Sequence, residues 1–148
     1  MQSDKFAHMS TYSNPKMLAA FEEISFPEFD MYNIRAKIDT GAYSGAIHCT
    51  KIYESEEDGK KTLYFSPFDN PELIKKTHKY VKRNVRSSNG TSQDRFFVDT
   101  TIIIGGHEYP IHISLADRSE MRWPALIGRR FLKNNRFVVD VHRHSHVS

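Results

Sequence analysis

The feature that most constrains this sequence is a series of short segments in which apolar and polar residues alternate, separated by turn-forming pairs. Alternation with a period of two is the pattern of a half-buried β-strand. Asp58-Gly59 and Asn89-Gly90 are typical of tight hairpins, and Gly105-Gly106 separates two further segments. The predicted strands are 34–38, 46–53, 62–65, 80–86, 95–99, 100–104, 109–115, 125–127 and 136–141. This succession favours an all-β barrel or sandwich over alternating β–α units.

Three segments have a helical pattern. Asn14-Pro15 could begin a helix, and residues 17–24 fit either a short helix or a strand. Residues 72–76 and 129–134 are short helical candidates. The polar, aperiodic residues 1–13 predict a mobile tail, and 142–148 a C-terminal tail. One domain is therefore expected over residues 14–141.

The composition excludes several classes of protein. A length of 148 residues allows one domain with a real core, and a single Cys excludes a disulfide framework or a Cys-x-x-Cys site. No run approaches the roughly 20 apolar residues of a membrane span, and the N-terminus lacks a signal peptide's apolar core. We expect a soluble cytoplasmic protein with no membrane partner.

The net charge of +3 conceals an asymmetry. Residues 1–74 carry 7 Lys/Arg and 12 Asp/Glu, a charge of −5, whereas residues 75–148 carry 14 and 6, a charge of +8. The basic half could indicate a nucleic acid, an acidic peptide partner or a solvated face. Its densest part, residues 75–86, lacks interleaved aromatic residues beyond Tyr80, so a nucleic-acid partner is not expected.

Two motifs are candidates for chemistry. Asp39-Thr40-Gly41 directly follows the alternating segment 34–38, and a small residue comes next. Such a strand presents a carboxylate in a tight turn and leaves room beside it, although these three residues are also common in ordinary turns. The second motif, Ala125 to Arg129, has three apolar residues, then a glycine, then a short helical candidate.

In this order, the motifs resemble those of retropepsin-type aspartic proteases. More closely, the chain resembles the bacterial retropepsin-like peptidases that have been labelled ATP-dependent zinc proteases. The matching segments are Glu23–Pro27, Ala36–Ala42, Val85–Gly90, Leu115–Arg118, Met121-Arg122 and Leu126–Arg129. The resemblance covers about residues 20–141 and implies a closed all-β acid-protease barrel with one short C-terminal helix. It also implies a strand over residues 20–26.

The resemblance implies an aspartic mechanism, in which two neighbouring carboxylates share one proton. The ionised carboxylate activates a water, and the protonated one donates to the developing oxyanion. Asp39 would supply one carboxylate, Thr40 a hydroxyl that can link two active-site loops, and Gly41 a turn whose N–H reaches the carboxylate. Gly128 would let the apolar strand pass close beneath this loop. The expected floor of the substrate site is Ala42, Ile127, Gly128 and Arg129.

A single Asp-Thr-Gly motif in a chain too short for two lobes predicts a homodimer, with one Asp39 from each subunit. The N-terminal region and residues 136–141 are the interface candidates. The hairpin around Asn89-Gly90 is the candidate flap over the substrate, the alternative being an ordinary exposed hairpin. Its expected substrate-binding residues are Ser87, Ser88, Asn89 and Gly90.

One position departs from the viral relatives, in which an acidic residue after Asp-Thr-Gly-Ala pairs with the Arg of the Ile-Gly-Arg motif. Tyr43 occupies that position here, so Arg129 needs another partner. The viral dimer arrangement therefore cannot be copied directly onto this chain.

No metal and no cofactor are expected. The nearest match to a zincin motif, His107 to His112, is one residue too long and contains Pro110, which would break the required helix. No phosphate-binding Gly-rich loop supports ATP. Alternating His142, His144 and His146 could bind a metal adventitiously, the alternative being a solvated tail. His48 and Cys49 are interpreted as structural residues.

The predicted function is peptide hydrolysis by an aspartic endopeptidase. If the hairpin is the flap, the basic stretch 75–86 could attract acidic peptides. Relatives of the resembling family are encoded near, or fused to, ligases that add glutamate to a ribosomal protein, and this makes acidic tails a reasonable substrate. The alternative is a non-catalytic binding module that acts on ribosome-associated or glutamate-ligase partners. The basic residues are Lys75, Lys76, Lys79, Lys82, Arg83 and Arg86.

Overall fold

The computed structural model describes residues 16–68, 70–86 and 89–143. The predicted N-terminal tail and most of the C-terminal tail lie outside these residues. The described elements are β1 (Lys16–Ala19), β2 (Phe21–Phe26), the 3-10 turn η1 (Pro27–Phe29), β3 (Met31–Ile38), β4 (Ala46–Glu57), β5 (Lys60–Pro67), β6 (Lys75–Thr77), β7 (Tyr80–Arg86), β8 (Ser92–Ile104), β9 (His107–Ala116), β10 (Ala125–Ile127), the helix α2 (Arg129–Asn134) and β11 (Phe137–Asp140).

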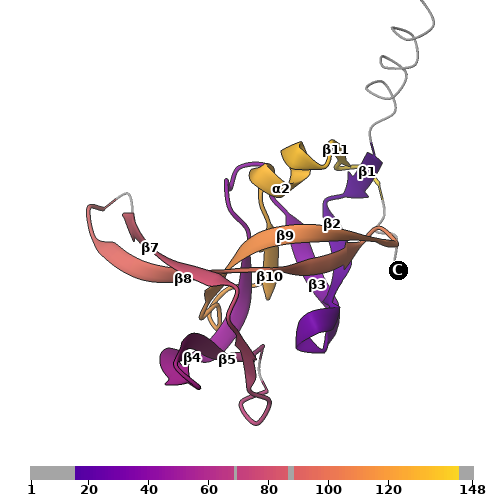
Figure 1. Cartoon of the computed structure of the whole chain (residues 1–148). Helices are drawn as coiled ribbons and strands as arrows, with labels where there is room; N and C mark the ends of the chain where they lie inside the picture. Colours follow the sequence, from indigo (N-terminus) through magenta and orange to yellow (C-terminus); the bar gives the residue numbers. More distant parts are fainter. Residues whose placement is uncertain (1–15, 69, 87–88, 144–148) are drawn as a thin grey trace, which may run out of the picture.

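Six of the described strands close into a barrel (Figure 1), in the order β10, β3, β2, β8, β9, β4 and back to β10. The short strand β10 completes the closure, because it runs parallel to β3 and antiparallel to β4. The barrel encloses the apolar core, whose fully buried members include Ile24, Ile47, Ile102, Ile113 and Ile127. The predicted all-β closed barrel with one short C-terminal helix is confirmed.

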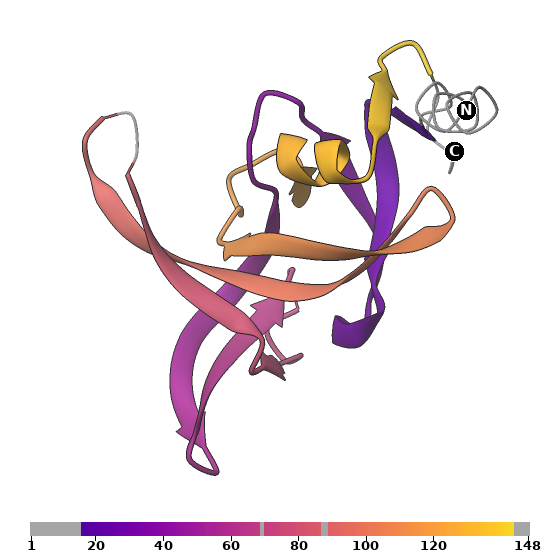
Figure 2. The same ribbon diagram turned by 45° about the horizontal axis from the view of Figure 1, so that its top comes forward.

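Strand β8 is long enough to pair with β9 in the barrel wall and with β7 in a separate two-stranded ribbon. Residues 96–104 pair with β9 inside the barrel wall, whereas residues 92–98 pair with β7. The β7–β8 ribbon therefore continues beyond the point where β9 stops pairing, and it curves away from the barrel (Figures 1 and 2). The segments 95–99 and 100–104, predicted as separate strands, form this one continuous strand.

Residues 17–24 form strands, so the helical alternative is wrong. Strand β1 pairs parallel with β11, and β2 pairs antiparallel with β3 and also contacts β8. At the bend between β1 and β2, the buried Glu22 carboxylate accepts the Ala19 N–H at 2.7 Å. Pairing with these neighbours overrides the local helical propensity. The strand implied for residues 20–26 is confirmed.

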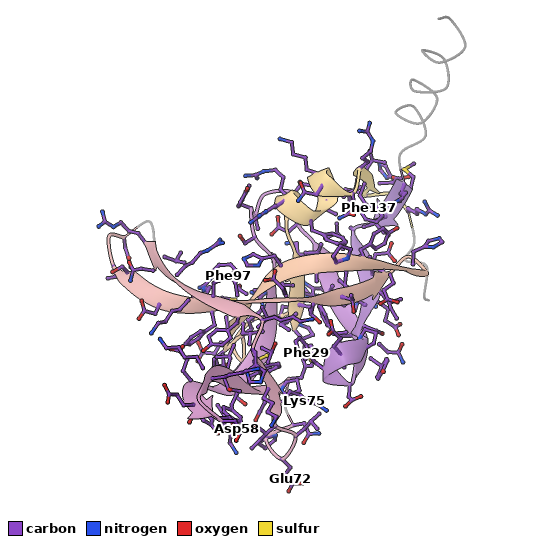
Figure 3. The ribbon with its side chains drawn as sticks, in the orientation of Figure 1. Phe29, Asp58, Glu72, Lys75, Phe97 and Phe137 are labelled. Carbon is purple, nitrogen blue, oxygen red and sulfur yellow. The ribbon has the colours of Figure 1, made fainter. Side chains whose placement is uncertain are left out.

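The β4–β5 hairpin forms an arm below the barrel in the view of Figure 1. Asp58 and Gly59 join its strands with φ values of 52° and 77°, as their sequence predicts. The helix predicted over residues 72–76 is wrong, because Lys75–Thr77 pair with β5 instead. Figure 3 shows Asp58 and Glu72 at one end of the molecule and Phe137 at the other. No described helix is long and apolar enough to cross a membrane.

Candidate active site

The Asp39 loop begins where β3 leaves the barrel. The Asp39 N–H donates to the Ile127 carbonyl at 2.8 Å, so the loop is fixed to β10 at its first residue. The Gly41 N–H donates to Asp39 Oδ1 at 2.8 Å, and the Ala42 N–H donates to the Asp39 carbonyl at 3.3 Å. The Asp39 side chain is half-buried. These bonds hold its carboxylate in a defined direction at the end of a buried strand.

Gly128 lies against the backbone of the Asp39 loop. A Cβ at this position would lie 2.7 Å from both the Ser44 carbonyl carbon and the Tyr43 oxygen, and 2.9 Å from the Ala42 oxygen. Side chains do not fit at such distances, so only glycine lets β10 approach this closely. The next two residues bind the same loop: the Arg129 N–H donates to the Ala42 carbonyl at 2.6 Å, and the Arg130 N–H to the Tyr43 carbonyl at 3.0 Å.

Arg129 has two partners in place of the acidic residue found in viral relatives. Its Nη1 donates to the Thr40 carbonyl at 2.9 Å, and its guanidinium lies 5.6 Å from the centre of the Tyr43 ring. A guanidinium over an aromatic face is an attractive cation–π contact. The aromatic residue directly after Asp-Thr-Gly-Ala is a sequence signal for this arrangement, although by itself it indicates only that the acidic partner is missing.

Gly45 and Ser114 are positions that sequence reasoning missed. A Cβ on Gly45 would lie 2.5 Å from the Leu126 oxygen. Ser114 on β9 is buried, and both its N–H and its hydroxyl donate to the Gly45 carbonyl, at 3.2 and 2.9 Å. The far end of the Asp39 loop is thereby fixed to the barrel wall. The small residues in Ser44-Gly45-Ala46 were the available signal, but the partner on β9 follows only from the fold.

The candidate flap residues lie at the end of the β7–β8 ribbon. Ser87 and Ser88 fall outside the described residues, whereas Asn89 and Gly90 are exposed. Gly90 has a φ of +89°, and the Thr91 N–H donates to Asn89 Oδ1 at 3.2 Å, so the turn is closed locally. In Figures 1 and 2 this ribbon and the loop between β3 and β4 extend on the same side of the barrel. The structure thus brings the Asp39 loop and Gly128 together, and the hairpin turn lies apart from them.

Half of the predicted basic stretch is neutralised by carboxylates from the N-terminal half of the chain. Lys75 pairs with Asp30, and Lys76 pairs with Glu57. Lys82 Nζ lies 3.2 Å from Glu54, which also accepts the Tyr80 hydroxyl at 2.7 Å. These two hydrogen bonds, that of Tyr80 above all, lower the pKa of Glu54. Arg83 stacks over Phe97 at 5.1 Å. The density of basic residues in the sequence therefore overstates the free positive charge here.

The two histidines of the zincin-like segment, His107 and His112, lie too far apart to share a metal ion. His107 and His112 lie on strand β9, where they pair with Ile104 and Asp99, and His112 Nδ1 lies 2.8 Å from Asp99 Oδ1. Five residues along a strand separate two positions by roughly 17 Å, too far for one metal ion. Among the described residues, no three His, Cys, Asp or Glu side chains gather as metal ligands. His144 and His146 lie outside the described residues.

His48 and Cys49 are buried on β4. His48 Nδ1 accepts the Arg118 N–H at 2.7 Å and so fixes the start of the loop between β9 and β10. Burial raises the pKa of the Cys49 thiol, which keeps it protonated. Both residues have the structural roles that the sequence predicted.

Comparison with known proteins gives one family and two kinds of relative. Residues 17–147 match a family described as retropepsin-like aspartic endopeptidase RimB. A probable alpha-L-glutamate ligase from Shewanella pealeana is 30% identical over 85% of this chain, and one from Desulfotalea psychrophila is 27% identical over 84%. The chain spans only 29% and 28% of those two proteins. A crystal structure of a Legionella pneumophila protein of unknown function has a TM-score of 0.72 and 23% identity, covering 91% of this chain and all of that one, and it shares the fold.

Proposed function

The chain belongs to the RimB-like family of retropepsin-like aspartic endopeptidases, and we propose that it hydrolyses peptide bonds with two Asp39 carboxylates, one from each subunit of a homodimer. The observation that carries this proposal is the setting of Asp39. Among the described residues, only the Gly41 N–H donates to its carboxylate. One carboxylate oxygen is thus oriented by the backbone, and the other is left for a water or a second carboxylate.

The proposed chemistry needs no covalent intermediate. Two carboxylates brought within a few ångströms share one proton, because like charges at that distance cannot both ionise easily. The ionised Asp39 takes a proton from a water, which attacks the peptide carbonyl, and the protonated Asp39 of the partner subunit donates to the oxygen that becomes negative. The Gly41 N–H orients the carboxylate, and the Ile127 carbonyl holds the Asp39 backbone, so the water would meet a base held in position.

The two-stranded β1–β11 sheet supports the proposed dimer. Met17 and Val138 are register partners in this sheet, and they are 44% and 39% exposed. Val141, just beyond β11, is 73% exposed. Apolar side chains that face solvent side by side on a terminal sheet are suited to a subunit interface.

We propose acidic, glutamate-rich peptides as the substrates, bound in extended form beneath the β7–β8 flap. The relatives named probable alpha-L-glutamate ligases support this class, because their name concerns glutamate and this chain matches a part of each. The same names support one alternative, a non-catalytic module that binds a glutamate ligase or a ribosome-associated partner.

The test uses the wild type and an Asp39→Asn variant against neutral and glutamate-rich peptides, from mildly acidic to neutral pH. We expect cleavage by the wild type, loss of at least a hundredfold in the variant, inhibition by a pepstatin-type compound and no effect of EDTA. Sedimentation should give a dimer at assay concentrations. A folded dimer that cleaves nothing would favour the binding module, and a strict monomer would exclude the shared pair of carboxylates.

A further inference from the structure

Two arginines lie on a pair of aromatic rings beside the strand that ends at Asp39. The rings of Phe21 and Trp123 are 4.4 Å apart and tilted by 43°. The Arg35 guanidinium lies 5.5 Å from the centre of the Phe21 ring and 5.6 Å from that of Trp123, and the Arg122 guanidinium lies 5.2 Å from that of Trp123. We call Phe21, Arg35, Arg122 and Trp123 the arginine–aromatic shelf.

The shelf lies on the strands that hold Asp39. Successive residues of a strand point to opposite faces, so Arg35 and Lys37 share one face of β3, and Asp39 directly follows the end of this strand. Both Arg35 and Lys37 are exposed, whereas Ile34, Ala36 and Ile38 are buried. Four residues of extended chain place Arg35 roughly 13 Å from Asp39 along the strand.

The other members of the shelf lie beside the same strand. Phe21 is the register partner of Lys37, and the neighbouring Ala20 carbonyl accepts the Ile38 N–H at 2.8 Å. Trp123 comes two residues before Ala125, which pairs with Ala36. An extended peptide that follows β3 from Asp39 would therefore reach the shelf within a few residues.

In the part of the chain that the structure describes, no ion pair neutralises the positive charge of the shelf. No described carboxylate lies within 4 Å of the side-chain nitrogens of Arg35, Lys37 or Arg122, although Glu23 is the register partner of Arg35. This distinguishes the shelf from the basic stretch 75–86, where three of six cations are paired. A guanidinium stacked on an aromatic face is held in place and still presents its N–H groups at its edge. Such edges match the two oxygens of a carboxylate.

We propose that the arginine–aromatic shelf is the subsite that recognises an acidic side chain of the substrate, a few residues from the bond that is cut. This proposal rests on the proposed function, because it assigns specificity to the same site. Arg35 and Arg122 bind the carboxylate, and Trp123 supports both arginines. Lys37, which lies between Arg35 and Asp39 in the sequence, adds electrostatic attraction for the acidic substrate. The recognition of acidic substrates thus belongs to the barrel floor and the β9–β10 loop, with the basic stretch 75–86 in a minor role.

Trp123 is the one tryptophan of the chain and provides a probe for the test. The full chain carrying Asp39→Asn is titrated with a hexaglutamate peptide and with a hexaglutamine peptide, followed by Trp123 fluorescence and by calorimetry. We expect the glutamate peptide to change the fluorescence and to bind at least tenfold more tightly. Adding Arg35→Gln and Arg122→Gln should weaken that binding about tenfold or more and leave glutamine binding unchanged.

The matched control is Lys60→Gln with Lys61→Gln, which removes the same charge at the β4–β5 turn and should change binding less than twofold. Equal weakening of hexaglutamate binding by the arginine pair and by the lysine pair of substitutions would overturn the subsite. Full affinity for hexaglutamate in an Arg35→Lys, Arg122→Lys variant would also overturn it, because positive charge alone would then suffice. An oligonucleotide that competes as well as hexaglutamate would assign the shelf to nucleic acid instead. If the wild type cleaves no peptide but binding follows this pattern, the subsite is upheld and the proposed hydrolysis is rejected. If the wild type cleaves glutamate and glutamine peptides equally well, hydrolysis is upheld and the subsite is rejected.

Discussion

Replacing Gly128 by Ala tests whether the close contact between β10 and the Asp39 loop holds the candidate site together. The added Cβ would lie 2.7 Å from two backbone atoms of the loop, whereas ordinary contacts begin near 3.4 Å, so the two segments must separate by about 0.7 Å. That separation stretches the hydrogen bonds from the Arg129 and Arg130 N–H groups to the Ala42 and Tyr43 carbonyls. The contact is backbone against backbone, so a side-chain rotation cannot relieve it.

The expected cost follows from these contacts. Overpacking of this kind costs about 1–3 kcal/mol, and two weakened hydrogen bonds add about 1 kcal/mol each. A loss of about 3–5 kcal/mol corresponds to a fall of roughly 6–20 °C in melting temperature for a chain of this size. If Asp39 is catalytic, its displacement should also lower kcat by on the order of tenfold to a hundredfold.

The assay is thermal unfolding followed by circular dichroism, with peptide cleavage measured on the same preparations. Gly106→Ala is the control, since its Cβ would meet open space and its φ of +83° costs only about 1 kcal/mol. We expect the control to lose a few degrees and to keep its activity. A Gly128→Ala protein with the melting temperature and activity of the wild type would refute the reasoning, because the loop would then be free to move away at no cost.

Two further predictions concern titratable groups. Burial raises the pKa of the Cys49 thiol, so this residue should react with a disulfide reagent at pH 8 only after the protein is unfolded; rapid reaction of the native protein would contradict its buried position. The hydrogen bond from Tyr80 lowers the pKa of Glu54. The stabilisation of the fold by ionised Glu54 is therefore complete at pH values above the ordinary carboxyl pKa of about 4.3, and it is lost as the pH falls through the lowered pKa. Glu54→Gln should therefore lower the melting temperature at pH 7, and this difference should shrink as the pH falls through the lowered pKa; an equal decrease at every pH would show that the charge of Glu54 is not involved.

The sequence predicts the barrel well because its signals are local. Alternation and the pairs at Asp58-Gly59 and Asn89-Gly90 identify strands and hairpins from neighbouring residues alone. The failures are those in which distant pairing decides the structure. Residues 72–76 have a helical pattern but lie beside β5, which takes Lys75–Thr77 as an edge strand. The hydrogen bonds from Ser114 to Gly45 join residues 69 positions apart, so no local pattern could reveal them.

The charge split between the two halves of the sequence is also altered by the fold. Asp30, Glu54 and Glu57, all from the acidic half, pair with lysines of the basic stretch, so much of the asymmetry cancels within the molecule. Charge that can act on a partner is charge left without a carboxylate neighbour. Among the described residues near the shelf, it belongs to Arg35 and Lys37 from the acidic half and to Arg122 from the basic half. The sequence does contain a signal for this. In Arg35-Ala36-Lys37-Ile38-Asp39, the strand alternation that buries Ala36 and Ile38 places both cations together on the exposed face of the strand that ends at Asp39.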